Sequence, residues 1–314
     1  MPSLGADVRN FVKQADAVER LAGFDAIIHL AGLSNDPLGD YRPGLTQEIN
    51  AVASADLARL AKAAGIPRFI YASSCSNYGA SGDGFVAEDG DLNPVTPYGV
   101  SKVEAEAAIS VMADETFSPT FLRASTAFGV SPRLRFDLVV NNLTAWACAT
   151  GHVRLKSDGQ PWRPLVHVED IATAYIASLE APRELVHLGV FNVGQTSENY
   201  QIHEVAEIVR SVVPGSSITF SNEVGADIRN YRVDCNHISR TLHGFKPQWT
   251  VRRGVEQLYD AFCSAGLTVE QFEGPRFKRI AHVKHRIDAG EIDGELFPVS
   301  ESQGKGGSDA LATA

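Results

Sequence analysis

A tyrosine and a lysine four residues apart, Tyr98 and Lys102, follow the serine pair Ser73 and Ser74 by about 25 residues. On a helix, residues four apart lie on the same face, so the ammonium can sit beside the phenol. A phenol has a pKa of about 10, and a neighbouring cation lowers that pKa. With a serine hydroxyl to hold a substrate oxygen, these groups predict proton transfer in an alcohol–ketone conversion, the chemistry that accompanies hydride transfer to a nicotinamide.

The surrounding sequence favours this interpretation over a tyrosine and a lysine on a solvent-facing helix. The apolar run from Arg68 to Ser74 predicts a buried parallel strand that ends in hydroxyls. Prolines from Pro94 to Pro97 then predict the start of a helix near Tyr98. The serines therefore lie where open α/β sheets bind ligands, at the carboxyl end of a strand. We favour Ser74 over Ser73 as the catalytic serine.

Strand and helix signals alternate along the first half of the chain, which predicts a doubly wound parallel sheet. The expected strands are 25–30, 68–74 and 119–123, and the expected helices are 46–64, 98–113 and 138–150. We expect a loop over 79–96. Segments 151–166 and 195–250 are polar and predict irregular structure.

Several short motifs, taken together, carry a family resemblance. They are Ser73–Gly79 with Tyr98–Lys102, His29–Gly32, Asn50 in a helix, Trp162–Asp170, and Phe191–Gly194. In this order they resemble the extended short-chain dehydrogenase/reductases. More narrowly, they resemble the NAD-dependent epimerase/dehydratase family, which acts on nucleotide sugars. The resemblance covers roughly residues 5–262.

The resemblance implies a Rossmann-type fold and a nucleotide-sugar substrate, with NAD as cofactor and NADP as the alternative. It implies Ser74, Tyr98 and Lys102 as the catalytic residues, and no metal. The implied cofactor-binding residues are Asp7, Val8, Leu30, Ala31, Gly32, Asn50, Tyr98 and Lys102. The implied substrate-binding residues are Arg133, Asn141, Asn142, Arg163 and Arg229. Thr126 stands where many relatives have a substrate-binding asparagine.

By the same resemblance, residues 1–130 form a truncated dinucleotide-binding domain with the catalytic residues. Residues 131–300 mainly bind substrate, although 165–195 return to the sheet. Residues 301–314 are rich in glycine and serine and predict a disordered tail.

One departure from the family stands out. Its G-x-x-G-x-x-G loop, which cradles the cofactor pyrophosphate, is absent from the sequence. Met1–Arg9 resembles the end of the family's third strand, so two strands and a helix are expected to be missing. The strand at 25–30 would then form an exposed apolar edge that invites aggregation or a partner. The sequence is either a fragment or a degenerate protein that binds dinucleotide poorly.

Two functions follow. The first is an NAD(P)-dependent epimerase or ketoreductase acting on a nucleotide sugar. The second is a non-catalytic relative that binds a nucleotide sugar or dinucleotide, or an inactive fragment. Dehydration is disfavoured because Cys75-Ser76 stands where dehydratases carry Asp-Glu. A packed, inert thiol is the favoured interpretation of Cys75, and a hydrogen-bonded core histidine that of His167. The basic stretch 276–286 predicts a solvated helix face or a contact with an anionic partner or second subunit.

Composition limits the kinds of molecule that the protein could bind and the compartment in which it could work. The net charge of −10 argues against nucleic-acid binding by charge attraction. Four scattered cysteines show no metal-ligand spacing, which is typical of reduced thiols. No apolar run is long enough to cross a membrane. We expect a cytoplasmic protein that forms a homodimer.

Overall fold

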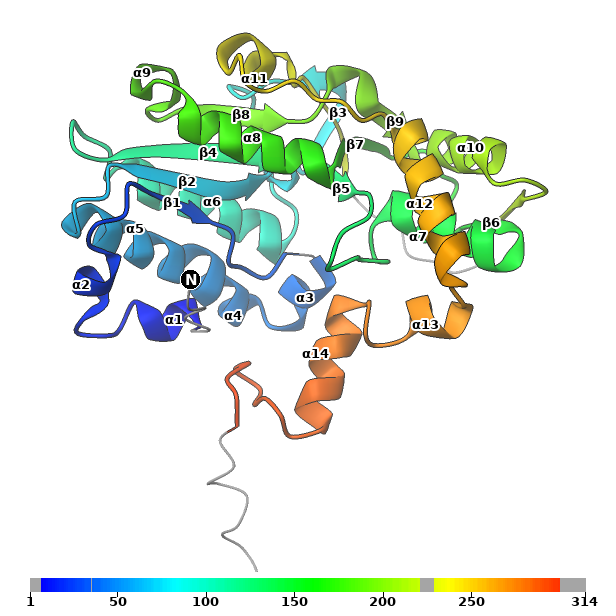
Figure 1. The fold of residues 1–314 in the computed structure, drawn as a ribbon, viewed down its shortest axis with the longest axis horizontal. Coiled ribbons are helices and arrows are strands. Elements are labelled where there is room, and N and C mark those ends of the chain that lie inside the picture. Colours follow the sequence, from blue (N-terminus) through cyan, green and yellow to red (C-terminus); the bar gives the residue numbers. More distant parts are fainter. Residues whose placement is uncertain (1–6, 35, 221–228, 300–314) are drawn as a thin grey trace, which may run out of the picture.

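The computed structural model describes residues 7–34, 36–220 and 229–299. Its central sheet has four parallel strands in the order β1 (Ala26–His29), β2 (Arg68–Ser74), β4 (Ser118–Ala124) and β8 (Val190–Val193). Figure 1 shows helices above and below this sheet. The doubly wound parallel sheet predicted from the sequence is confirmed.

The side chains of β2 explain why helices cover both faces of the sheet. Successive residues of a strand point to opposite faces, so a strand covered on both sides is apolar throughout. Phe69 and Tyr71 pack with Ala58 of α5 (Ala53–Ala63) on one face. Ile70 packs with Ala174 of α8 (Val168–Glu180) on the other.

The predicted helix at 46–64 forms as three consecutive pieces. These are α4 (Pro43–Gln47), a π-helical segment η1 (Glu48–Val52) and α5. A π segment inside a helix often marks a functional position, because it displaces one residue from the regular hydrogen-bond ladder. Here the displaced segment contains Asn50, whose carbonyl accepts a hydrogen bond from the Tyr71 hydroxyl at 3.1 Å.

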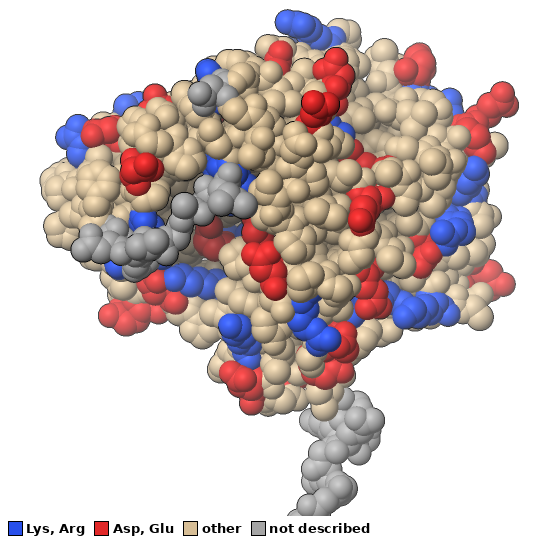
Figure 2. Space-filling view, turned by 180° about the vertical axis from the view of Figure 1, so that it is seen from behind, with Lys and Arg blue, Asp and Glu red and all other residues tan. Residues whose placement is uncertain are grey.

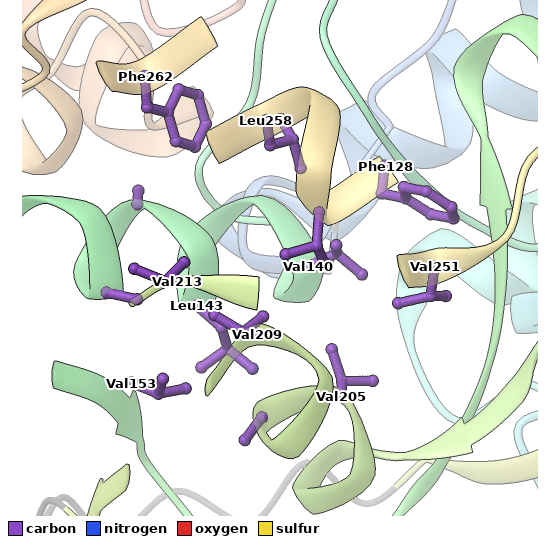
Figure 3. Packing of buried hydrophobic residues seen from close by; sticks show 14 of the residues in the cluster. Phe128, Val140, Leu143, Val153, Val205, Val209, Val213, Val251, Leu258 and Phe262 are labelled. Atoms are coloured by element: carbon purple, nitrogen blue, oxygen red, sulfur yellow. The ribbon is translucent and has the colours of Figure 1, made fainter. Parts of the chain in front are cut away.

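A second core lies beside the sheet. It is built on α7 (Val139–Thr150), α10 (Ile202–Val212) and α12 (Val251–Ala265) with the parallel pair β6 (His152–Leu155) and β10 (Ser217–Phe220). In Figure 3, Val140 and Leu143 of α7 lie between Leu258 and Phe262 of α12 and the valines of α10.

The prediction of irregular structure over 151–166 and 195–250 is therefore wrong. Besides β6, α10 and β10, these segments contain β7 (Trp162–His167), η3 (Thr196–Glu198), β9 (Asn199–Gln201), β11 (Asn230–Val233) and α11 (Asn236–Thr241). The predicted loop 79–96 also contains a strand, β3 (Ala80–Val86), which pairs with β11. Each of these strands is short and pairs with a segment distant in sequence, so local periodicity does not reveal it.

The remaining elements complete the two layers and the connections. They are α1 (Val8–Phe11), α2 (Ala17–Leu21), α3 (Asp36–Tyr41), η2 (Cys75–Tyr78), α6 (Pro97–Ser110), β5 (Thr126–Phe128), α9 (Arg183–Val186), α13 (Val269–Glu273) and α14 (Arg279–Asp288). The basic helix α14 packs against α3, below the sheet in Figure 1. The predicted disordered tail lies outside the described residues.

Strand β1 is the edge of the described sheet, where it pairs only with β2. Ile28 on this strand is 38% exposed, and Leu30 just after it is 64% exposed. The predicted apolar edge is therefore present among the described residues.

The surface carries both signs of charge. On the face drawn in Figure 2, acidic and basic side chains of the described residues are interspersed. Across the part of the chain that the structure describes, no helix combines the length and apolar character needed to cross a membrane.

Candidate active site

The hydroxyls of Ser74 and Tyr98 meet at the carboxyl end of β2. Ser74 ends that strand, and its Oγ accepts a hydrogen bond from the Ser76 amide at 3.1 Å. Tyr98 lies in the first turn of α6, near enough to Ser74 for that side chain to lower the pKa of its phenol. Ser73, in contrast, donates to the buried carboxylate of Glu106. The structure thus brings Ser74, and not Ser73, to the tyrosine.

Local backbone features place α6 against this strand end. The helix starts at Pro97, and the Thr96 hydroxyl caps it by accepting from the Gly99 amide at 3.2 Å. Gly79, which follows η2, has a φ of 58°. A Cβ on Gly79 would lie 1.7 Å from the Asn93 carbonyl oxygen, so only glycine permits this approach. The loop ahead of the helix is thereby held against the serine segment.

Lys102 lies one helical turn after Tyr98 and is only 5% exposed. Its ammonium donates to the Ala72 carbonyl at 2.7 Å and to the Tyr71 hydroxyl at 3.3 Å. The Nζ atom is 5.8 Å from the centre of the Tyr98 ring. The predicted Tyr–Lys pair therefore shares one face of α6 and points into the same buried site.

The electrostatics of the pair differ from the sequence-based expectation. Burial raises the pKa of Tyr98 to about 12, even though the neighbouring Ser74 side chain lowers it. The expectation that the neighbouring cation gives Tyr98 a lowered pKa is wrong for this structure, because loss of solvation outweighs the other effects. Burial also lowers the pKa of Lys102 to about 8, against an opposing effect from Glu106.

The segment after β1 passes directly over Lys102. Leu30, Ala31 and Gly32 are exposed there, and a Cβ on Gly32 would lie 2.9 Å from Asn50 Oδ1 and 3.8 Å from Lys102 Nζ. Asn50 is fully buried, and its carboxamide accepts from the Leu33 amide at 2.7 Å. The structure thus brings together six of the eight predicted cofactor residues: Leu30, Ala31, Gly32, Asn50, Tyr98 and Lys102.

The other two predicted cofactor residues, Asp7 and Val8, lie at the start of α1. The Asp7 carboxylate caps this helix by accepting from the Arg9 amide at 2.9 Å and pairs with the Arg9 guanidinium at 2.8 Å. Although burial opposes them, these hydrogen bonds lower the pKa of Asp7. The Phe297 ring, from the C-terminal segment, lies 3.8 Å from the Arg9 guanidinium.

Two predicted substrate residues, Arg163 and Arg229, lie side by side. Arg163 is 4% exposed and donates to the backbone carbonyls of Trp162 and Arg229, both at 2.6 Å. Arg229 forms an ion pair with Asp36 at 2.5 Å. Asp36 also accepts from the hydroxyl of Thr96, the cap of the catalytic helix, at 2.7 Å. Arg229 is thereby linked through Asp36 to the cap of the catalytic helix.

The other predicted substrate residues surround the loop between β5 and α7. Asn141 accepts from the Gly129 amide at 3.0 Å and donates to the Arg135 carbonyl at 2.9 Å. Asn142 donates to the Phe136 carbonyl at 2.9 Å. Both asparagines therefore hold the loop in place with their side chains. Arg133 is exposed on this loop.

Sequence reasoning missed Asp36 and Arg135. Arg135 pairs with Asp137 at 2.9 Å and donates to the Ser34 carbonyl at 3.3 Å. The charges of Asp36 and Arg135 both act on the pKa of Tyr98, Asp36 raising it and Arg135 lowering it. The Asp36-Pro37 pair does signal a helix start, but nothing local indicates either long-range contact.

A network of buried polar side chains lies next to the candidate site, on α6, β4 and η2. Glu106, one turn beyond Lys102, accepts from Arg123 Nη2 at 2.6 Å and from Asn77 at 3.0 Å. Arg123 also donates to the Tyr78 hydroxyl at 3.0 Å. The Arg123–Glu106 pair is nearly inaccessible to solvent, so each charge depends on the other.

Cys75 and His167 are packed as the sequence suggested. Cys75 donates to the Arg123 carbonyl at 3.1 Å, and burial raises the pKa of its thiol to about 12. His167 is fully buried, and its Nε2 is 2.9 Å from Gln257 Oε1. Within the described ranges, no three His, Cys, Asp or Glu side chains form a group that could hold a metal ion.

Comparisons with known proteins place this geometry in a family. An uncharacterized UDP-glucose epimerase of Bacillus subtilis is 26% identical over 257 residues, which cover 78% of each protein. A UDP-glucose 4-epimerase of Neisseria meningitidis is 27% identical over 262 residues, covering 75% of this chain and 74% of that protein.

Solved structures show the same fold. MoeE5 in complex with UDP-glucose and NAD is 25% identical, with a TM-score of 0.69 over 82% of this chain and 85% of that one. A UDP-glucose 4-epimerase from Thermotoga maritima is 20% identical, with a TM-score of 0.72 over 83% and 84% of the two chains. Residues 4–194 match the sequence profile of the NAD dependent epimerase/dehydratase family, which is more than half of the 314 residues. The chain belongs to the NAD dependent epimerase/dehydratase family.

Proposed function

We propose that this chain interconverts a hydroxyl and a keto group on a nucleotide sugar, as an epimerase or a ketoreductase that uses NAD or NADP. Ser74, Tyr98 and Lys102 are the catalytic residues. The observation that carries the proposal is the meeting of three side chains at the end of a parallel strand: Ser74 ends β2 and acts on the pKa of Tyr98, and Lys102 Nζ lies 5.8 Å from the centre of the Tyr98 ring. Ser74 positions the substrate oxygen and Tyr98 exchanges its proton.

The pKa values assign a direction to each proton movement. With a pKa of about 12, Tyr98 is a neutral phenol at pH 7 and is set to donate a proton to a carbonyl oxygen. To accept a proton from a sugar hydroxyl, Tyr98 must first become easier to ionise. Lys102, with a pKa of about 8, is mainly protonated at pH 7 and is the adjacent cation that favours the phenolate.

The described residues fit one end of a dinucleotide. A side chain at position 32 would contact Asn50 and approach Lys102, so the bare backbone of Gly32 leaves a cradle beside the lysine. We place the nicotinamide ribose there, against Leu30, Ala31 and Gly32, and the adenine near Asp7 and Val8. When bound, the cofactor supplies hydride transfer to or from a sugar carbon. The 314 residues contain no G-x-x-G-x-x-G for the pyrophosphate, so we expect weak binding.

The substrate's diphosphate is assigned to the arginines. A guanidinium matches phosphate oxygens bidentately. Arg163 and Arg229 lie together, and Arg229 is linked through Asp36 to Thr96, the cap of the catalytic helix. We assign Arg133, Asn141 and Asn142, from the loop between β5 and α7 and from α7 itself, to binding the nucleotide part of the substrate. Because two relatives are named for UDP-glucose, a UDP-sugar is the first substrate to test.

We keep the assignment of functions to segments of the chain that the sequence predicted. We assign cofactor binding and catalysis to residues 1–130, and substrate binding mainly to 131–300, with 165–195 returning to the sheet. A homodimer in the cytoplasm remains a prediction.

A second candidate is a relative that binds its ligand without turnover. Calorimetric titration of residues 1–314 with UDP-, dTDP-, GDP- and CDP-sugars measures binding, and product analysis at millimolar NAD or NADPH measures conversion. Conversion of a nucleotide sugar that binds supports the enzyme. Binding without conversion at saturating cofactor supports the non-catalytic relative.

A further inference from the structure

The ring and the hydroxyl of Tyr71 both contact the Lys102 ammonium. Tyr71 lies in β2, the strand that Ser74 ends, and is fully buried. Its hydroxyl accepts a hydrogen bond from Lys102 Nζ at 3.3 Å, and Nζ lies 4.7 Å from the centre of its ring. A cation within about 6 Å of a ring centre is attracted to the face of the ring. Tyr71 therefore holds the lysine by two contacts, although the site residues predicted from the sequence do not include it.

The Tyr71 hydroxyl is fixed as an acceptor toward Lys102. A hydroxyl has one proton to donate and lone pairs that accept. That proton is donated to the Asn50 backbone carbonyl at 3.1 Å. Burial raises the pKa of Tyr71 well above its usual value, so the phenol keeps this proton at neutral pH. The hydroxyl oxygen therefore presents a lone pair to the ammonium.

Strand β2 accepts two hydrogen bonds from Lys102. An ammonium has three N–H donors. One donates to the Ala72 carbonyl at 2.7 Å and another to the Tyr71 hydroxyl. For the third donor, the structure gives no acceptor among the described residues. Gly32 lies beside this ammonium, since a Cβ on Gly32 would be 3.8 Å from Nζ. Because the three donors are tetrahedral, fixing two of them also fixes the direction of the third.

We propose that Tyr71 is a positioning residue, which holds the Lys102 ammonium so that its third N–H is directed to the cofactor ribose beside Gly32. This inference rests on the proposed function, which places the ribose there. Tyr71 acts through Lys102 and not on the reacting atoms. Without the hydroxyl, the hydrogen bond to Ala72 remains, and the ammonium can rotate about that single bond. The third N–H then loses its fixed direction.

The titratable groups that face Lys102 come from three elements. Glu106 and Tyr98 lie on its own helix α6, Tyr71 lies on β2, and His29 lies on β1. Burial lowers the pKa of Lys102 to about 8, and Glu106 opposes this effect. His29, with a pKa of about 4, and Tyr98, with a pKa of about 12, are both uncharged at pH 7. The Tyr71 hydroxyl is therefore one of the few groups that offset the burial of the ammonium.

Replacing Tyr71 by phenylalanine tests the inference, because the ring stays and only the hydroxyl is lost. In Tyr71→Phe, the pKa of Lys102 should fall by about one unit, since an acceptor of the ammonium is removed. NMR of the free protein with ¹³C-labelled lysine measures this pKa, and Lys102→Arg identifies the resonance. Tyr175→Phe, at another buried tyrosine, is the control and should leave the pKa unchanged. Circular dichroism checks that both variants are folded.

Cofactor binding provides a second readout. Titration up to millimolar NADH should show weaker binding to Tyr71→Phe than to wild type, whereas the affinity for a nucleotide sugar should be retained. An unchanged Lys102 pKa in the folded variant overturns the inference, and so does unchanged NADH affinity. The NMR titration needs neither cofactor nor turnover. A lowered Lys102 pKa and weaker NADH binding in a protein that converts no nucleotide sugar would therefore support the role of Tyr71 and overturn only the proposed function.

Discussion

Asp36 and Arg229 form an ion pair, 2.5 Å between Oδ2 and Nη1, across 193 positions of the sequence. The same carboxylate accepts a hydrogen bond from the Thr96 hydroxyl. The Asp36 side chain, at the start of α3, therefore joins Arg229 to the cap of the catalytic helix. A diphosphate that binds Arg229 must therefore compete with Asp36.

Replacing Asp36 tests this competition. Asp36→Asn retains an acceptor for Thr96 but removes the charge that faces Arg229. We expect a loss of at most about 1 kcal/mol in the free energy of unfolding, because the pair is partly solvated. Calorimetry should show tighter binding of a nucleotide sugar, and the gain should vanish in an Arg229→Ala background. Weaker binding in Asp36→Asn would show that Asp36 itself supports the substrate.

Arg163 is expected to bind the diphosphate. Loss of one charge-assisted hydrogen bond costs about 1.5–3 kcal/mol, or roughly 10- to 150-fold in affinity. Arg163→Ala should show this loss for the nucleotide sugar and a smaller loss for NADH, both measured by titration. Circular dichroism checks the fold, because Arg163 is buried. Unchanged affinity in a folded variant would move the diphosphate elsewhere, with Arg133 and Arg229 the next candidates.

The pKa of Lys102 predicts the alkaline limb of the activity. Its ammonium is protonated below its pKa of about 8 and is lost as the pH rises through that value. Tyr98 stays protonated over this range, since its pKa is about 12. We therefore expect kcat, measured from pH 6 to 10, to fall above about pH 8. Glu106→Gln should shift this fall to lower pH, because Glu106 favours the ammonium. A profile that stays flat to pH 10 would contradict the role given to Lys102.

The buried Glu106–Arg123 pair predicts a large effect on stability. Glu106→Ala leaves the Arg123 charge buried without its partner, so the free energy of unfolding should fall by about 3–5 kcal/mol. Urea unfolding followed by circular dichroism measures this value. Glu104, exposed on the same helix, provides the control, and Glu104→Ala should cost under about 1 kcal/mol. Equal effects of the two substitutions would remove the network as a support of the site.

The sequence correctly predicted the elements whose signals lie within the element itself. The apolar run 68–74 forms β2 with those bounds, and the prolines before Tyr98 mark the start of α6. Strands β3, β6, β10 and β11 were missed because each is stabilised by a partner distant in the chain. The sign of the Tyr98 pKa shift was missed for a related reason. Spacing shows that a cation is near, but only the folded structure shows that burial of the phenol outweighs the neighbouring charges.

Turnover by Tyr98→Phe tests the central claim most directly. The substitution keeps the ring and removes the proton, so nucleotide-sugar affinity should be unchanged. With the preferred nucleotide sugar at millimolar cofactor, kcat should fall by about 10²–10⁴-fold. Tyr41→Phe, on the exposed end of α3, should leave kcat unchanged. A Tyr98→Phe variant that retains kcat within about threefold of wild type, well inside that range, would contradict the account.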